Sequence, residues 1–294
     1  MGEKRQRGDR RDGRWVKDVP GLQTVMAHLM PNRTDCEVFM NDKFDVTELL
    51  KYLEKKNAEH PDYKTTMFHC LITCVARMVK ERPKMNRFIQ GRRMYERNEI
   101  SLSFVVKRRF SDSGEESLMV LVPNDEDTLD SISRKIVGDV KETRKSEGAT
   151  GGIDAVLDAF AKIPRPILMF VIRVIRWLDF WGLVPNALTD GDPNYTSVLL
   201  SNLGSIQAPA VYHHLNNYGT NSLMITIGTI HKEELVMSDG SKQIRDVVDI
   251  GATLDERIGD GFYFARSLKL VKHIFANPEL LERPLGEPSG FEYK

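Results

Sequence analysis

The most constraining feature of this sequence is a stretch near its C-terminus that changes from strand spacing to helix spacing within a few residues. Apolar residues recur there at the spacing of a buried strand: Val247, Val248, Ile250, Ala252 and Leu254. The apolar residues that follow recur at intervals typical of one helix face: Phe264, Leu268, Val271 and Phe275. Asn277-Pro278 then ends the helix. The sequence therefore predicts a strand, a short turn and a helix, a unit found in α/β domains.

The turn between these two elements concentrates polar residues. Asp255, Glu256 and Asp260 lie close together, with Gly259 and Gly261 among them. Side chains at a strand-to-helix junction are well placed for chemistry, because a rigid scaffold holds the loop on both sides. An ordinary acidic turn, with Asp260 as the N-cap of the helix, explains the same residues. The spacing alone leaves both interpretations open.

The rest of the chain also mixes short strands with helices. Strand patterns occur at residues 36–40, 87–89, 92–95, 101–107, 117–121, 196–200, 223–227, 234–236 and 245–250, with a hairpin turn at Gln90-Gly91. Helix patterns occur at residues 45–56, 64–81, 128–145, 153–163 and 166–182. Asp45 and Glu48 are placed to form a capping box. His69, beside an apolar helix stripe, is interpreted as a packed or surface residue, not as a ligand.

Composition narrows the class of protein. Among 294 residues, 41% are hydrophobic and 29% charged, which is typical of a soluble globular protein. The 42 basic and 42 acidic residues balance, so charge gives no reason to expect a nucleic-acid partner. Cys36, Cys70 and Cys74 lack the spacing of a zinc site or a redox pair, so we expect no metal. Together with the lack of an apolar secretory segment at the start, they favour the cytoplasm.

The charge pattern divides the chain into three parts. Residues 1–18, rich in arginine, are expected to form a flexible basic tail, and an arm that binds nucleic acid or a membrane is the alternative. Residues 19–285 are expected to form a single domain, and residues 286–294 a C-terminal tail.

Residues 166–182 form the most apolar helix pattern. Arg173, Arg176 and Asp179 interrupt it, leaving fewer than the ~20 apolar residues that a membrane span requires, so no integral membrane segment is expected. These polar residues share one face, which makes the helix amphipathic. The first interpretation is a core helix packed on a sheet. A wall for an acyl chain and a helix lying at a membrane surface are the alternatives.

Two motifs resemble those of one enzyme superfamily. The strand, turn and helix around residues 255–261 resemble the His-x-x-x-Asp-Gly signature of the chloramphenicol acetyltransferases and dihydrolipoamide acyltransferases. Asp260-Gly261 match its end, and Glu256 stands at the position of the catalytic His. Ser201-Asn202-Leu203-Gly204 is similar to a segment of dihydrolipoamide acyltransferase cores, and residues 277–281 are similar to their closing helix end. The order of elements over residues 33–280 also agrees.

The resemblance implies a fold and a reaction. The fold is α/β, a chloramphenicol acetyltransferase-like two-layer sandwich whose mixed, mostly antiparallel sheet is flanked by helices. The reaction moves an acyl group from acyl-coenzyme A to a thiol or hydroxyl through a tetrahedral intermediate. The resemblance assigns the base to Glu256, the oxyanion-stabilising hydroxyl to Ser201 and an organising role to Asp260. Residues implied as structural support are Arg33, as the partner of Asp260, and Asn202, Gly204 and Gly261. The resemblance also implies a homotrimer whose active sites lie at subunit interfaces.

The replacement of His by Glu256 leaves three readings. Imidazole has a pKa near 6.5, whereas an unperturbed Glu has a pKa near 4.3. Glu256 serves as the base if burial raises its pKa toward ~6–7, and Arg257 opposes that rise if it turns toward the carboxylate. His213 and His214, in the loop after the Ser201 motif, are the alternative bases. In the third reading the chain is a noncatalytic family member, an oligomeric scaffold or ligand-binding protein.

The family also suggests a partner. Dihydrolipoamide acyltransferases usually carry lipoyl and subunit-binding domains on Ala/Pro-rich linkers, and this sequence contains neither. We therefore expect no covalently bound lipoyl group. A separate lipoyl or acyl carrier would supply or receive the acyl group.

Overall fold

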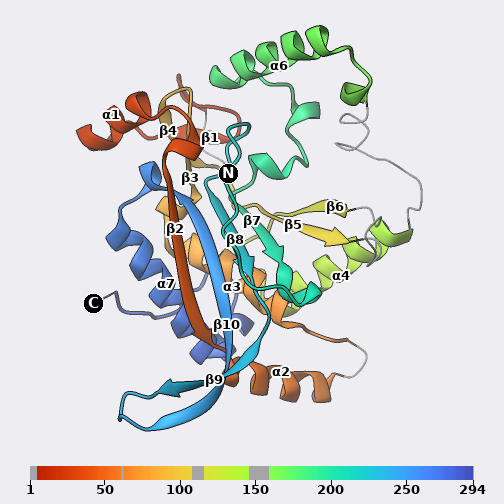
Figure 1. Ribbon diagram of the computed structural model, residues 1–294, viewed down its shortest axis with the longest axis vertical. Helices are drawn as coiled ribbons and strands as arrows, with labels where there is room; N and C mark the ends of the chain where they lie inside the picture. The colour runs from red at the N-terminus through yellow and green to blue at the C-terminus, as the bar shows by residue number, and fades with distance from the viewer. Residues whose placement is uncertain (1–4, 61–62, 108–115, 146–158, 294) are drawn as a thin grey trace.

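A seven-stranded mixed sheet forms the centre of the molecule (Figure 1). The computed structural model describes residues 5–60, 63–107, 116–145 and 159–293. In spatial order, six strands of the sheet are β2 (Glu37–Asp45), β10 (Lys242–Asp255), β8 (Leu223–Ile227), β7 (Val198–Asn202), β5 (Leu102–Lys107) and β6 (Glu116–Leu121). The seventh, β9 (His231–Val236), pairs with the first half of β10. Only the β5–β7 and β7–β8 ladders are parallel among these strands, so the predicted mixed, mostly antiparallel sheet is confirmed.

Helices cover one face of this sheet. They are α2 (Thr47–Glu59), α3 (Met67–Glu81), α4 (Leu129–Lys145) and α7 (Gly261–Ala276), and Figure 1 shows α3 behind the strands. Helix α3 is central, since every residue from His69 to Val79 is buried. Aromatic pairs join the two layers: Phe44 of β2 packs edge-on against Phe275 of α7, with ring centroids 5.7 Å apart. The core lies between these layers and holds β10 rigidly up to the polar turn.

A second, three-stranded sheet lies at the end of the molecule that carries the chain's start. It consists of β1 (Gly13–Trp15), β4 (Arg93–Arg97) and β3 (Arg87–Gln90). The predicted hairpin around Gln90-Gly91 is confirmed, with Gly91 and Arg92 both at positive φ, +57° and +61°. Two consecutive residues at positive φ give the turn that matches the twist of a tight hairpin.

Both segments expected as tails contact the domain. Strand β1 pairs with β4, and Arg10 is buried, where its guanidinium hydrogen-bonds to Asp12 and to Asp179. Near the other end, Ser289 donates its hydroxyl to Glu81 of α3, 2.7 Å away. The charge pattern at the start did not indicate this, because the partners of Arg10 include a residue 169 positions away.

The apolar helix predicted at residues 166–182 is α6 (Arg165–Phe180), and it is not a core helix. Within it only Ile175 and Asp179 are buried. It lies at the same end of the molecule as α1 (Gly21–Leu29) (Figure 1). The sequence pattern could not distinguish a core helix from a surface helix with an exposed apolar face, because both have the same periodicity of apolar residues. No helix among the described residues is long and apolar enough to cross a membrane. Most of the predicted helix at 153–163 lies outside the described residues.

Helix α3 begins with a capping box that the sequence analysis missed. The Thr66 hydroxyl accepts from the His69 N–H, and the His69 ring Nδ1 accepts from the Thr66 N–H. The box expected at Asp45 and Glu48 does not form, since Asp45 accepts from the Thr47 N–H while Glu48 pairs with Lys51 and Arg245. His69 is a packed residue, as predicted.

The His69 box leads to a prediction about acid stability. Burial lowers the pKa of His69 from 6.5 to about 4. Between these values the unfolded chain binds a proton that the folded chain does not, so unfolding free energy falls as pH drops, by about 3 kcal/mol in total. Gln can accept the Thr66 hydrogen bond at this position without titrating. His69→Gln is therefore expected to show a shallower loss between pH 7 and pH 4 in urea unfolding. The exposed His60→Gln control should keep the wild-type slope; equal slopes in all three proteins would contradict the assignment.

Candidate active site

The polar turn joins β10 to α7 through a short 3-10 helix, η6 (Glu256–Ile258). Asp260 is the N-cap of α7, and its carboxylate accepts the Tyr263 N–H at 2.7 Å. This confirms the capping role. The Asp260 side chain is exposed, and its carboxylate lies on the outer surface of the turn.

Asp255 and Arg257 form a buried ion pair inside the same turn. Their side chains are 0% and 1% exposed. The guanidinium donates through Nε and Nη2 to the two carboxylate oxygens, at 2.8 and 2.6 Å, and through Nη1 to the Met30 carbonyl. Burial alone would lower the pKa of Arg257, but the hydrogen bonds and charge of Asp255 outweigh it and raise that pKa. Such a two-pronged pair fixes the geometry of the turn.

Glu256 lies between these two buried residues and is itself half-buried. Its N–H donates to the Cys36 carbonyl at 2.9 Å, which ties the turn to the start of β2. The Glu256 and Asp255 carboxylates add to the effect of burial, which raises the pKa of the Cys36 thiol to about 11 despite Arg257. The Arg257 guanidinium is turned toward Asp255. It therefore does not pair with Glu256.

Arg33 does not pair with Asp260 as expected. In the described part of the chain its buried guanidinium donates to the Ile89 carbonyl at 2.9 Å, to the Gln90 side chain at 3.1 Å and to the Asn216 carbonyl. Burial lowers the pKa of Arg33 to about 10, against the nearby charge of Asp255. The pairing fails because Asp260 is exposed and caps α7.

The Arg33 cluster extends to the C-terminal end of α6. Gln90 donates to the Asp179 carboxylate at 2.6 Å, and Arg10 approaches the other Asp179 oxygen at 3.1 Å. Burial raises the pKa of Asp179 in spite of these partners. A cavity of about 210 Å³ is lined by residues of this cluster and of the turn, including Arg33, Gln90, Asp179 and Arg257. Sequence reasoning missed Gln90 and Asp179, since nothing in their local spacing marks them.

Ser201 lies at the end of β7 and is half-buried. The next residue, Asn202, caps the 3-10 helix η5 (Leu203–Ile206) by accepting the Ser205 N–H. A side chain at Gly204 would come within 2.4 Å of the Gly228 carbonyl, so this close approach requires glycine. These neighbours fix the backbone that follows Ser201 at the strand end.

The strand register separates Ser201 from Glu256 within one chain. Ser201 lies opposite Thr226 of β8, and Thr226 lies opposite Gly251 of β10. Glu256 directly follows the last residue of β10, and the strand rises about 3.3 Å per residue beyond Gly251. The Cα atoms of Ser201 and Glu256 are therefore about 15 Å or more apart. One protomer cannot place both on the same reacting group.

His213 and His214 lie in the loop that leads from β7 to β8. Both are exposed, and their rings stack with centroids 4.7 Å apart. The loop passes over Gly251 of β10. A Cβ atom at position 251 would lie only 2.8 Å from the carbonyl oxygen of Val211 in this loop. The following residue, Leu215, donates its N–H to Glu37, which lies opposite Asp255 in the β2–β10 ladder. The loop thus brings both histidines toward the end of β10 that carries Glu256.

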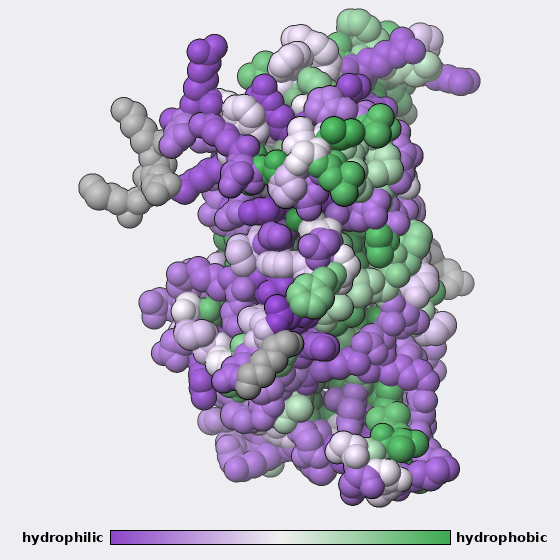
Figure 2. Space-filling view, turned by 90° about the vertical axis from the view of Figure 1, so that its left-hand side faces the viewer, coloured by the Kyte–Doolittle hydropathy of each residue, from purple (hydrophilic) through white to green (hydrophobic). Residues whose placement is uncertain are grey.

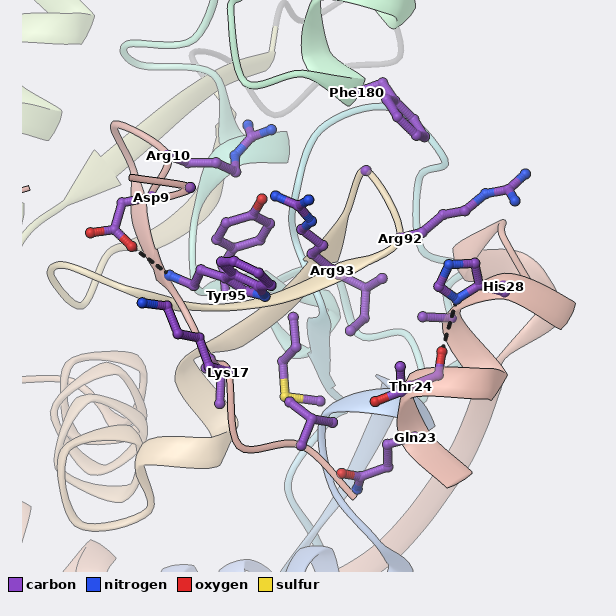
Figure 3. Close-up of a pocket in the computed structure, with 18 of the residues that line it drawn as sticks. Asp9, Arg10, Lys17, Gln23, Thr24, His28, Arg92, Arg93, Tyr95 and Phe180 are labelled. Atoms are coloured by element: carbon purple, nitrogen blue, oxygen red, sulfur yellow. Dashed lines mark hydrogen bonds between the residues drawn. The ribbon is translucent and has the colours of Figure 1, made fainter. Parts of the chain in front are cut away.

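A second cavity, of about 680 Å³, has no residue of the polar turn in its lining. Figure 3 shows Arg10, Lys17, Arg92 and Arg93 around it, with Phe180 at its edge. It lies between the small sheet and α1, and the end of α6 closes one side.

No group of three or more His, Cys, Asp or Glu residues that could hold a metal occurs in the described ranges.

The sequence profile of one family matches most of the chain. This family is described as the 2-oxoacid dehydrogenases acyltransferase (catalytic domain), and the match covers residues 16–147 and 186–282. The chain belongs to this family. Both halves of the candidate site, the Ser201 strand end and the Glu256 turn, lie inside the matched segments. Residues 148–185 are unmatched, and α6 lies within them.

A curated relative points to the same family. The lipoamide acyltransferase component of the branched-chain alpha-keto acid dehydrogenase complex from Bacillus subtilis is 23% identical over 268 residues. The match covers 88% of this chain and 52% of that protein. This chain therefore spans about half the length of the curated relative.

Solved structures of dihydrolipoamide acyltransferase cores share the fold. The probable dihydrolipoamide acetyltransferase of Listeria monocytogenes has a TM-score of 0.59 at 19% identity, covering 89% of this chain and 95% of that one. The cubic core of a pyruvate dehydrogenase multienzyme complex has a TM-score of 0.60 at 15% identity, and the match covers 90% of this chain and 93% of that one. The dihydrolipoamide acetyltransferase of Azotobacter vinelandii has a TM-score of 0.60 at 16% identity, and the match covers 95% of this chain and 94% of that one. The catalytic mechanism of that enzyme was studied at a serine, a histidine and an asparagine. The expected fold class is confirmed.

Proposed function

We propose that this protein is an acyltransferase that moves an acyl group from acyl-coenzyme A to a thiol or hydroxyl acceptor. The family profile supports the reaction class, since it spans both motifs. The observation that carries the proposal is the position of Glu256. It is half-buried at the end of a core strand and held between the members of a buried ion pair.

Glu256 is the proposed base. Its carboxylate takes the proton of the acceptor as the acceptor sulfur or oxygen attacks the acyl carbonyl. The tetrahedral intermediate then collapses, the bond to the coenzyme A sulfur breaks, and the proton returns to that thiolate. Arg257 donates its side-chain hydrogen bonds to Asp255 and makes no ion pair with the Glu256 carboxylate. His213 and His214 are the alternative bases, since their loop runs toward the same strand end.

Ser201 of a neighbouring subunit is the proposed oxyanion donor. The register that separates Ser201 and Glu256 within one chain supports a site built from two copies, in a homotrimer. A structural relative is the cubic core of a multienzyme complex. The Azotobacter enzyme was studied at a serine and a histidine, with an asparagine four positions after the histidine. Here Glu256 and Asp260 have that spacing.

A separate lipoyl or acyl carrier is the proposed partner. The curated relative, a lipoamide acyltransferase, is about twice as long as the matched segment. A thiol on such a carrier fits the proposed acceptor class. Coenzyme A is a substrate in this scheme, and no metal takes part in the proposed steps.

Calorimetry with coenzyme A and acetyl-coenzyme A tests the proposal without knowledge of the acceptor. Dissociation constants in the micromolar range are expected. ATP is the matched control ligand, because it carries adenine and phosphates but no pantetheine arm. No binding at millimolar coenzyme A, or binding no tighter than that of ATP, would contradict the proposal and favour the noncatalytic scaffold.

A further inference from the structure

Helix α6 carries an apolar stripe on the side that faces solvent. Its inward side is defined by the buried residues Ile175 and Asp179. On the opposite side five large residues recur at intervals of three and four positions, from the helix to the residue after it: Ile167 (54% exposed), Phe170 (66%), Val174 (38%), Trp177 (59%) and Trp181 (60%). This spacing places all five along one line of the helix. We call them the α6 stripe. Monomeric proteins rarely leave such a surface without a function.

The exposed charges of α6 are all positive. Arg165, Arg173 and Arg176 are exposed, and at 100° per residue they fall within an arc of about 80° between the stripe and the buried side, with Arg173 nearest the stripe. The single acidic residue, Asp179, is buried and bound by Arg10 and Gln90. The whole chain has a net charge of zero, so this local excess of positive charge is a feature of the helix and its surroundings. An anionic surface is its electrostatic complement.

The rest of the fold holds α6 with this stripe outward. Arg10 donates to the backbone carbonyl of Asp179 at 2.6 Å as well as to its side chain. Gly91, in the β3–β4 turn, has no side chain, and this allows the Phe180 carbonyl to pack against it. Buried polar contacts at its C-terminal end therefore hold α6 in this orientation, and the side chains of the stripe take no part in them.

Neighbouring elements extend the same surface. Arg7 is exposed on the segment that Arg10 anchors to the C-terminal end of α6, whereas Arg11 of the same segment pairs with Asp190. Helix α1 exposes Leu22, Val25 and Leu29, and Figure 1 places α1 at the same end as α6. Figure 2 shows apolar side chains gathered toward this end among hydrophilic ones.

We propose that α6 docks the protein on the surface of an anionic phospholipid bilayer, with the α6 stripe in the interfacial layer and its arginines on the lipid headgroups. Two of the three tryptophans of the chain are in the stripe, and tryptophan favours this layer because one part of its ring is apolar and the other polar. The 16 residues of α6 lie on the bilayer and do not cross it. A second copy of this chain fits less well, since α6 offers these arginines no acidic partner: its one acidic residue, Asp179, is buried.

Vesicle flotation of the full chain, without acyl-coenzyme A, tests this proposal. Vesicles of phosphatidylcholine alone are compared with vesicles that contain about one third phosphatidylglycerol. The wild type is expected to co-float with the anionic vesicles at least about tenfold more than with the neutral ones, and less at high salt. Tryptophan fluorescence should shift to shorter wavelength on binding, because Trp177 and Trp181 leave water.

Two sets of variants identify the surface. Phe170→Glu with Trp177→Glu is expected to lower anionic-vesicle binding about tenfold or more, and Arg173→Glu with Arg176→Glu to remove the preference for anionic lipid. The control, Val236→Glu with Ile244→Glu, changes residues of similar exposure, 71% and 72%, on the β9–β10 hairpin and should bind as the wild type does. No co-flotation, or equal loss in the control, would overturn the proposal. A change of solution mass in the α6 variants without vesicle binding would assign the stripe to a second copy. None of these readouts depends on acyl transfer.

Discussion

Glu256→Gln is expected to lower acyl-transfer turnover about 100-fold or more, which is the usual loss when a general base is removed. The fold should stay intact, because Gln has the same shape and the Glu256 carboxylate makes no hydrogen bond within the described ranges. Ser201→Ala is expected to cost about 100-fold as well, through loss of an oxyanion donor. The measurement is turnover with acetyl-coenzyme A and a small dithiol, with oligomeric mass checked for each variant.

Mixing the two inactive variants is expected to restore activity. In a trimer that combines Ser201→Ala and Glu256→Gln subunits at random, one site in about four receives an intact Ser201 from one subunit and an intact Glu256 from its neighbour. Up to about a quarter of wild-type turnover should therefore return after the subunits are exchanged. The strand register requires this outcome if the two residues act together, since one chain holds them about 15 Å or more apart.

The controls separate the possible failures. Glu126→Gln, an exposed change of the same kind in the loop before α4, should keep full turnover. Glu256→His places the imidazole of the family motif at the strand end and is expected to remain active. Full turnover in Glu256→Gln would move the base to His213 or His214. Two inactive variants that do not complement each other in verified mixed trimers would contradict the shared site.

Local patterns in the sequence sufficed for the elements that position this site. The periodicity of α3, the hairpin at Gly91, the strand before Glu256 and the cap at Asp260 all follow from residues within a few positions of each other. The fold class followed from their order together with the motif resemblance. Such features are predictable because short-range geometry determines them.

The polar cluster behind the turn could not be predicted in this way. Arg33 binds the carbonyl of Ile89, 56 positions away, and Arg10 binds Asp179, 169 positions away. Each arginine has many carboxylates and carbonyls as possible partners, and only the packed structure selects one. For the same reason the sequence could not show whether the apolar side of α6 faces solvent or the core. The resemblance gave Asp260 as the partner of Arg33, yet Asp260 is exposed and caps α7.

Arg257→Met is expected to lower the free energy of unfolding by about 3–5 kcal/mol, because it leaves the Asp255 carboxylate buried without its partner. Asp255 is fully buried, and its carboxylate accepts from Nε and Nη2 of the Arg257 side chain as well as from the Arg257 backbone N–H, which alone remains after the substitution. Urea unfolding at neutral pH measures the change. Lys242→Met, which breaks the exposed pair with Glu234, is the matched control and should cost less than about 1 kcal/mol. A similar small loss in both variants would contradict the structural role of the buried pair.

The double variant Asp255→Leu with Arg257→Met separates stability from positioning. Replacing both members of a buried pair by apolar residues removes the unpaired charge, so most of the lost unfolding free energy should return. The turn would still lose the hydrogen bonds that hold it, including that from Arg257 to the Met30 carbonyl. Glu256 lies between the two, so turnover should stay at least about tenfold below wild type although the protein is stable again. Wild-type turnover in the double variant would mean that the ion pair stabilises the domain without positioning the proposed base.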